Sequence, residues 1–409
     1  MRRLPLLILL AASLAFSSCS SPLRQASTPG PLILISIDGF RWDYLEKLNA
    51  PTLRRLASEG VHARRLQPVF PARTFPNHYT IVTGLHAEHH GIVNNTFHDP
   101  ALGLDFGKGN TESVWWDQGE PIWITAEKQG LRTACYFWPG SEAEIGGRRP
   151  STFLPFKRNV PELERVHQVL EWLAQPASQR PRFVTLYFDL VDIVAHEQGP
   201  ESPATAAAVA TVDAAITRLV EGLDRLGLGN AASLVIVSDH GLSEISPERV
   251  VFFEDFMDVS QVSIEAAGPH GGVRPKPGVE LAPLLAAIRS KLPPQVRAYG
   301  PDDRPARLHY RDHPRIPPIL FHLDDGWCIE QRSSWPVLRA RYGHGNHGWD
   351  PAVPNMGALF IAHGAAFQRG RQLGEVPNTD IYNLLCGVLG IQPAPNDGTN
   401  ALTRAALRR

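Results

Sequence analysis

Three nearly continuous apolar runs stand out along the chain. They cover Leu32 to Ile37, Phe183 to Phe188 and Leu234 to Val237. Short runs without polar alternation are typical of strands that are buried on both faces, as in a parallel sheet. Each run is followed within a few residues by carboxylates, so the same end of each predicted strand carries polar side chains.

Helical periodicity fills the intervals between these runs. Leu53 and Leu56 fall on one helical face, and Gly60 is a stop signal for that helix. The pattern also predicts a helix over 204–227, a strand over Met356 to Ala362 and a closing helix over Asp380 to Leu389. Strands that alternate with helices favour an α/β fold with a large, mostly parallel central sheet flanked by helices.

The alternation stops between about Glu248 and Arg341. This stretch is rich in Pro and Gly and includes AAGPHGGVRPKPG. We expect it to be a small insertion that caps the core. The expected organisation is therefore a single domain over residues 31–409 with a cap insertion around 248–341.

The first 30 residues have the pattern of a segment that directs export of the protein. Two arginines precede the apolar run Leu6 to Ala15, and small residues lead to Cys19, which is the pattern of a signal peptide over residues 1–19. Residues 20–30 read as a linker. Cys19 after two serines also resembles a bacterial lipobox, although Phe16 is unusual at its start. We expect export to the periplasm, with plain secretion and a lipid anchor through Cys19 both open.

Composition and charge exclude some classes of substrate and of metal ligand. The formal net charge is -1, and no basic block suggests a track for a nucleic-acid polymer. Beyond Cys19 only three widely spaced cysteines remain, Cys135, Cys328 and Cys386, which form neither a disulfide framework nor a thiolate metal site. A bound metal would therefore use histidine and carboxylate ligands.

Such ligands follow the three apolar runs. Asp38 ends the first, Asp192 and His196 follow the second with a helical four-residue spacing, and Asp239 and His240 end the third. A single aspartate of this kind is more often a turn or helix cap. Three sets at strand ends of one α/β pattern are expected to meet at the ligand-binding edge of the sheet. Carboxylate oxygen and imidazole nitrogen suit zinc, with other divalent metals as alternatives.

Thr74 is the candidate nucleophile. It lies between Pro71 and Pro76, which restrict the backbone. A threonine hydroxyl is inert at neutral pH unless a metal or a base lowers its pKa. Taken alone, Thr74 would be an ordinary turn residue.

Six segments are distinctive when they are read together: IDGFRWDYL, PVFPARTFPNHYTIVTG, HGIVNN, YFWPGSEAEI, SDHG and GNHGWD. In this order they resemble the nucleotide pyrophosphatase/phosphodiesterase family of the alkaline phosphatase superfamily, in a bacterial single-domain form. The resemblance covers about residues 31 to 390. It implies a large mostly parallel sheet between helices, two Zn²⁺ per chain and hydrolysis of nucleotide phosphodiester or pyrophosphate bonds through a phospho-threonine.

The resemblance also implies the site residues. One zinc would be held by Asp38, Thr74, Asp239 and His240, and the other by Asp192, His196 and His347. His347 is chosen over His344 only by the resemblance, because both lie in one Gly-rich loop. Asn95, in preference to Asn94, would donate to a phosphate oxygen.

Aromatic residues would form the nucleotide site. The resemblance implies that Phe75 is one wall of a slot for the nucleobase, and that Phe156 and Tyr187 line the same pocket. A place in the core is the alternative for these aromatics. The chain departs from the family pattern at Ile193, Val194 and Ala195, which raises a question about local packing. The implied partners are small nucleotides such as nucleoside triphosphates, dinucleotides and nucleotide esters, and the oligomeric state is open.

Two other functions are alternatives to a diesterase. A phosphate monoesterase of the same superfamily would need an added cation, and the stretch from Phe137 to Ser141 has none. A non-catalytic metal-binding surface protein would not need a complete set of ligands together with a nucleophile. A diesterase is therefore the preferred interpretation.

Overall fold

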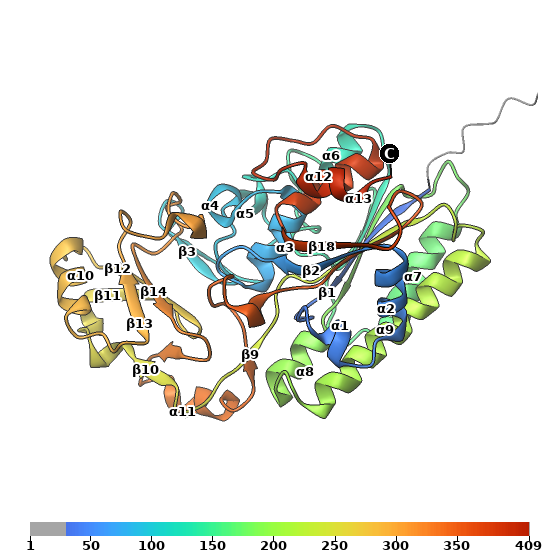
Figure 1. The fold of residues 1–409 in the computed structure, drawn as a ribbon. Helices are drawn as coiled ribbons and strands as arrows, with labels where there is room; N and C mark the ends of the chain where they lie inside the picture. Colours follow the sequence, from blue (N-terminus) through green and yellow to red (C-terminus); the bar gives the residue numbers. More distant parts are fainter. Residues whose placement is uncertain (1–29, 409) are drawn as a thin grey trace, which may run out of the picture.

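An eight-stranded sheet forms the centre of the protein (Figure 1). The computed structural model describes residues 30–408, so the predicted signal peptide and nearly all of the predicted linker lie outside the described residues. Only β17 runs antiparallel to its neighbours β8 and β2, which confirms the mostly parallel sheet. In spatial order the strands are β18 (Arg371–Pro377), β2 (Val61–Gln67), β17 (Phe360–Gly364), β8 (Ser233–Val237), β1 (Leu32–Ile37), β7 (Phe183–Phe188), β5 (Thr133–Tyr136) and β6 (Thr152–Leu154).

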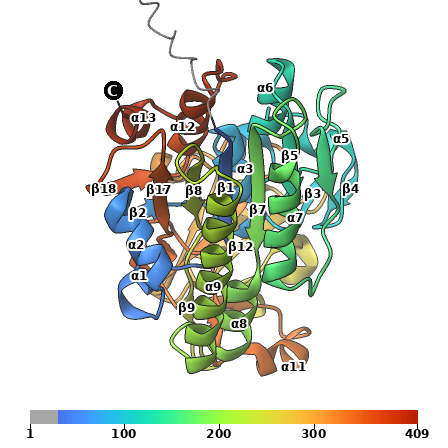
Figure 2. The same ribbon diagram turned by 90° about the vertical axis from the view of Figure 1, so that its right-hand side faces the viewer.

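Helices cover both faces of the sheet. Residues of β1 alternate between two hydrophobic clusters: Leu32 and Leu34 enter one, and Ile33 and Ile35 enter the other. This double burial explains the continuous apolar runs. One face is covered by α2 (Pro51–Glu59), α7 (Glu162–Ala174) and α9 (Pro203–Arg225), and the other by α3 (Thr74–Thr83), α6 (Ile122–Lys128) and α12 (Asp380–Leu389), with α13 (Ala401–Ala406) beside α12 (Figure 2).

The predicted helices begin and end close to the predicted residues, whereas one predicted strand begins later than expected. Gly60 ends α2, and Ser202 caps α9 by accepting a hydrogen bond from the backbone N–H of Thr205. The strand expected over Met356 to Ala362 begins only at Phe360, so its first half was wrong. A short 3-10 turn, η5 (Pro354–Met356), ends at Met356, and between it and β17 only Ala358 forms isolated bridges, to Arg41 and Leu66.

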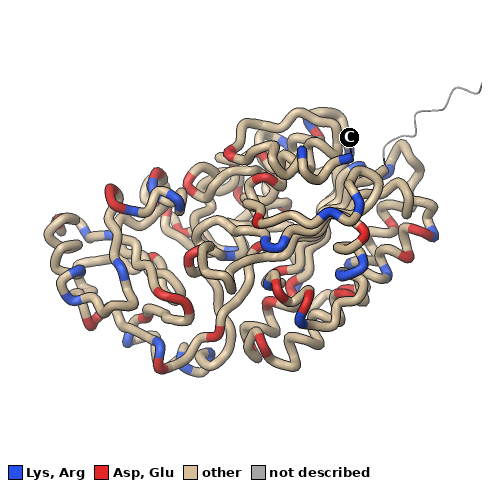
Figure 3. The backbone as a smooth tube through the Cα atoms, in the orientation of Figure 1, with Lys and Arg blue, Asp and Glu red and all other residues tan. Residues whose placement is uncertain are grey.

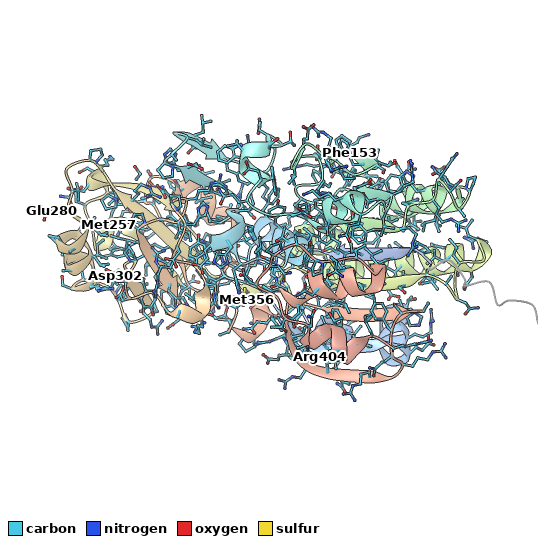
Figure 4. The ribbon with its side chains drawn as sticks, turned by 90° about the horizontal axis from the view of Figure 1, so that it is seen from above. Phe153, Met257, Glu280, Asp302, Met356 and Arg404 are labelled. Carbon is cyan, nitrogen blue, oxygen red and sulfur yellow. The ribbon has the colours of Figure 1, made fainter. Side chains whose placement is uncertain are left out.

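The stretch after Glu248 builds a second, smaller sheet. Its four antiparallel strands are β11 (Val262–Ala266), β12 (His270–Pro275), β14 (Ile319–Leu323) and β13 (Val296–Tyr299), with α10 (Leu281–Arg289) in contact with β13. A separate hydrophobic cluster that includes Val273, Ile288 and Phe321 fills it. Viewed from above, Met257, Glu280 and Asp302 lie at this end of the molecule, and Arg404 lies far from them (Figure 4).

Short α-helices and strands connect these elements. They are α1 (Tyr44–Lys47), α4 (Ala87–His90), β3 (Phe97–Asp99), β4 (Leu104–Phe106), α5 (Ser113–Trp116), α8 (Leu190–Gln198), β9 (Ser243–Glu244), β10 (Val250–Phe252), β15 (Cys328–Glu330), α11 (Trp335–Leu338) and β16 (Gly345–Asn346). Basic and acidic residues are interspersed over both sheets (Figure 3). Cys135, Cys328 and Cys386 are buried free thiols.

Candidate active site

The carboxylates that follow the three apolar runs converge at one edge of the sheet. Strands β7, β1 and β8 are direct neighbours and run parallel, so their carboxyl ends meet. Asp38 follows β1, Asp239 lies two residues beyond β8, and Asp192 lies in the first turn of α8, just after β7. The ligand-binding edge of an α/β sheet is thus lined by these side chains.

The first cluster surrounds the Nε2 atom of His240. This atom lies 2.9 Å from Oδ2 of Asp239, 3.5 Å from Oδ1 of Asp38 and 3.4 Å from Oγ1 of Thr74. All four side chains are buried. Each of them therefore presents one oxygen or nitrogen to the same small space.

The second cluster surrounds Oδ1 of Asp192. The Nε2 atom of His196 lies 3.4 Å from this oxygen, and the Nε2 atom of His347 lies 3.8 Å from it. The spacing between Asp192 and His196 is that of neighbours on one face of α8. Ile193, Val194 and Ala195 lie between them in α8 and do not separate the two side chains.

A glycine brings the loop of His347 to this cluster. A Cβ atom on Gly345 would lie 2.4 Å from the carbonyl oxygen of Ala195, so only glycine lets β16 lie this close to α8. The carbonyl oxygen of Gly345 then accepts a hydrogen bond from Nδ1 of His196 at 2.9 Å. His344 pairs through its backbone carbonyl with Ile245, and it is His347 that faces Asp192.

The three histidines of these clusters have the same tautomer. We assign the proton to Nδ1 in each case, because each Nδ1 faces a backbone carbonyl oxygen, and this leaves the Nε2 lone pair directed into the site. The acceptors are Gly345 for His196, Gly241 for His240 and Ala72 for His347, at 2.9, 3.1 and 2.8 Å. Such an arrangement is typical of metal-ligating histidines.

Three buried carboxylate oxygens show that the site suits cations. Within residues 30–408, Oδ1 of Asp38, Oδ1 of Asp192 and Oδ2 of Asp239 are buried and have no hydrogen-bond partner. A buried ionised carboxylate is costly unless it is paired or binds a metal. Burial, followed by the charges of Asp239 and Asp192, raises the pKa of Asp38 well above its usual value. Divalent cations would satisfy all three oxygens and reverse this shift.

Thr74 is the first residue of α3. Arg73 precedes it in extended conformation, and the side chain of Asn77 clamps the turn through the N–H of Val69 and the carbonyl of Pro71. The hydroxyl therefore lies at the positive end of a helix dipole, which favours negative charge. The rigidity expected from the prolines is reinforced by this side chain.

Asn95 lies beside the candidate nucleophile. Its Oδ1 accepts a hydrogen bond from the backbone N–H of Phe75 at 2.9 Å, which fixes the amide next to Thr74. Asn94 points elsewhere, since its Nδ2 lies 3.5 Å from Nε2 of His270. The structure thus distinguishes the two neighbouring asparagines.

The predicted aromatic residues fall into two groups. The ring of Phe75 lies 6.0 Å from Phe106 and 6.1 Å from Trp116. Phe156 is 44% exposed, and its ring lies 6.3 Å from that of Tyr187. Tyr187 is buried, and its hydroxyl donates to Oδ2 of Asp38 at 2.5 Å. Phe75 is thus partly buried against core aromatics, Phe156 is partly exposed, and Tyr187 contacts a predicted metal ligand.

Comparisons with known proteins identify the family of the chain. A family model described as type I phosphodiesterase / nucleotide pyrophosphatase matches residues 32–350. The chain belongs to this family.

Several relatives match nearly the whole chain, and a solved one has the same fold. A pyrophosphatase/phosphodiesterase of Schizosaccharomyces pombe is 38% identical over 380 residues, which are 90% of this chain and 78% of that protein. Mouse ectonucleotide pyrophosphatase/phosphodiesterase family member 1 is 37% identical over 391 residues, and the match spans 93% of this chain and 43% of the relative. A solved structure of murine ectonucleotide pyrophosphatase/phosphodiesterase 5, an inactive threonine-to-alanine variant in complex with AMP, has a TM-score of 0.85 and 32% identity. That alignment covers 92% of this chain and all of the solved chain.

Two residues that lie at the site were not selected in the sequence analysis. His78 lies with Asp38 and Asp239 in a group close enough to hold a metal. However, its Nε2 is 2.8 Å from Oγ of Ser36 and its Nδ1 is 2.9 Å from the carbonyl oxygen of Thr74, so both nitrogens are engaged. His78 supports Thr74, and its four-residue spacing from Thr74 was the signal that could have identified it.

Arg73 is the second such residue. It directly precedes Thr74, and its Nε has no hydrogen-bond partner among residues 30–408. Burial lowers the pKa of its guanidinium, which lies 3.5 Å from Oδ1 of Asn346. Its position directly before the candidate nucleophile in the sequence was a usable signal.

Within the described residues, no helix is both long and apolar enough to cross a membrane.

Proposed function

We propose that the chain hydrolyses phosphodiester and pyrophosphate bonds of small nucleotides, using Thr74 as nucleophile and two Zn²⁺. A nucleoside triphosphate would give a nucleoside monophosphate and pyrophosphate. The observation that carries the proposal is the convergence of the Thr74 hydroxyl on His240 beside three buried carboxylate oxygens without hydrogen-bond partners. The solved relative with AMP, which is inactive when a threonine is replaced by alanine, supports the same reaction class.

The donor set fits two divalent ions. Asp38, Thr74, Asp239 and His240 would hold one, and Asp192, His196 and His347 the other. When bound, the two ions would lower the pKa of the Thr74 hydroxyl and neutralise charge on the phosphoryl group and the leaving oxygen. Three carboxylates and a threonine alkoxide carry as many negative charges as two divalent cations carry positive ones.

The residues of the chain then perform two displacements. The Thr74 hydroxyl loses its proton to solvent and its oxygen attacks phosphorus, while the bond from phosphorus to the leaving oxygen breaks and that oxygen departs with the electron pair, which leaves a phospho-threonine. Water next attacks the same phosphorus and gives up a proton, and the Thr74 oxygen leaves with its electron pair and is protonated again. The Asn95 amide, held next to Thr74, would donate to a phosphoryl oxygen in both steps.

Nucleotide recognition would come from the aromatic groups. We propose that Phe75 stacks against the base, with Phe156 and Tyr187 lining the same pocket. Because Phe156 is substantially exposed, a base would bury apolar surface there that the free protein leaves in water.

The surroundings of the enzyme are also part of the proposal. We propose export to the periplasm, with Cys19 either lipidated or removed with the signal peptide, and a single catalytic domain over 31–409 with the cap insertion. The partners would be small nucleotides, without a nucleic-acid polymer.

The decisive experiment compares Thr74→Ala with Thr83→Ala, a buried threonine in the same helix. Zinc content and turnover of p-nitrophenyl thymidine monophosphate and p-nitrophenyl phosphate are measured for both variants. We expect Thr74→Ala to lose nearly all turnover and Thr83→Ala to keep it. Retained turnover in Thr74→Ala would refute the nucleophile, and a preference of the native chain for the monoester would refute the diesterase.

A further inference from the structure

Asp38 and Asp239 have the same pattern of contacts. One oxygen of Asp239, Oδ1, lies 3.2 Å from the backbone N–H of Gly39 and 3.4 Å from the hydroxyl of Ser238. One oxygen of Asp38, Oδ2, accepts from the hydroxyl of Tyr187 at 2.5 Å. The second oxygen of each carboxylate is the one without a partner among residues 30–408. In each case the protein holds one oxygen and leaves the other for the site.

Tyr187 is itself held firmly. It is the penultimate residue of β7, in register with Ser36 of β1, and only 7% exposed. Its carbonyl accepts from the buried guanidinium of Arg165 at 2.8 Å. Its ring packs edge-on against His78, with centroids 5.2 Å apart. The hydroxyl therefore has little freedom to leave Asp38, and a buried tyrosine hydroxyl needs such a partner.

We infer that Tyr187 is a positioning residue that orients Asp38, so that Oδ1 alone faces Thr74 and His240. This inference rests on the proposed two-zinc site. Without the tyrosine hydroxyl, the Asp38 carboxylate can rotate away from the neighbouring negative charge of Asp239. Outer hydrogen bonds to a metal ligand set its orientation, and their loss weakens metal binding about 10- to 100-fold.

Tyr187 can also line the base-binding pocket while it orients Asp38. The ring of Tyr187 also contacts Phe156, so the same residue connects the predicted base-binding aromatics with the metal ligand. If Tyr187 served only as an aromatic wall, its hydroxyl would be dispensable and phenylalanine would replace it without effect on the metal. The hydroxyl is therefore the group to remove.

The test is Tyr187→Phe, which keeps the ring and deletes one oxygen. The matched control is Tyr136→Phe on the neighbouring strand β5, because Tyr136 is also buried and its ring packs on Phe137. Competition with a chromogenic zinc chelator measures the affinity of both zinc equivalents. We expect one equivalent of Tyr187→Phe to bind about 10- to 100-fold more weakly, the other to be unchanged, and added zinc to restore turnover.

A double-mutant comparison tests whether Tyr187 and Asp38 act on the metal through the same contact. In an Asp38→Asn background, Tyr187→Phe should cause no further loss of zinc, because the two residues act through one contact. Native zinc affinity in Tyr187→Phe, or additive losses in the double variant, would overturn the inference. A native chain that binds no zinc would instead refute the proposed function, whatever Tyr187 does.

Discussion

His240 and His347 stack their imidazole rings with centroids 3.5 Å apart and an angle of 14° between the planes. His240 belongs to the cluster at Asp38 and Asp239, and His347 to the cluster at Asp192. The stack therefore joins the two halves of the site, and both rings are buried. Any cations held by the two clusters must lie close together, as two-metal phosphoryl transfer requires.

Removing one ring of this stack should remove one metal. We expect His347→Ala to lose one of two zinc equivalents and to lower kcat/KM for a nucleotide ester by at least about 100-fold, since an essential cation is missing. Elemental analysis and steady-state kinetics measure the two effects. His344→Ala, in the same loop, should keep both zinc equivalents, and an identical loss in the two variants would contradict the ligand assignment.

Asn95 should act on the reaction and not on the metals. Because its amide is fixed beside Thr74, we expect Asn95→Ala to lower kcat about 100- to 1,000-fold, the usual effect of removing one donor to a developing charge. Zinc content should stay native. Asn94→Ala is the control and should stay within about tenfold of the native rate. A change in KM alone for Asn95→Ala would show that this amide only helps to bind substrate.

Phe156 should matter only for substrates that carry a base. Stacking on an aromatic ring is worth about 1–3 kcal/mol per base, so Phe156→Ala should raise KM for p-nitrophenyl thymidine monophosphate about 5- to 150-fold. The side chain is 44% exposed, so stability should change little. Bis-p-nitrophenyl phosphate, which lacks a base, is the control substrate. Equal effects on both substrates would remove Phe156 from the nucleotide site.

His90 should make the fold sensitive to acid. It is buried, its Nε2 lies 3.0 Å from Oγ1 of Thr80, and its Nδ1 accepts from the N–H of Ile92. Burial, with smaller effects from two other histidines, lowers its pKa to about 3. The unfolded chain, with a pKa near 6.5, binds more protons below that value, so its contribution to stability is complete above pH 6.5 and declines as the pH falls toward 3.

Urea denaturation at pH 7 and pH 5 measures this effect. The difference in free energy of unfolding between the native chain and His90→Gln should shrink by about 2 kcal/mol over this interval, since other groups cancel in the comparison. A difference that is the same at both pH values would show that His90 does not titrate in this way.

Local patterns were sufficient for much of the fold. The apolar runs at 32–37, 183–188 and 234–237 correspond to β1, β7 and most of β8, because a strand buried on both faces needs apolar residues at every position. The one strand that was placed too early, at Met356, failed because Pro354 begins a turn there. The Asp192–His196 pair was also visible, since a four-residue spacing acts within one helical turn.

The remaining features depend on contacts between distant parts of the chain. The hydroxyl of Tyr187 reaches Asp38 across 149 positions, and Nδ1 of His347 meets the carbonyl of Ala72 across 275. Spacing contains no information on such contacts, because they follow from the order β7-β1-β8 and from the close approach of Gly345 to α8. The sequence by itself determined which side chains end the strands. Only the tertiary structure decided which of their atoms are held by the protein and which are left for a ligand, because strand order and loop packing orient them.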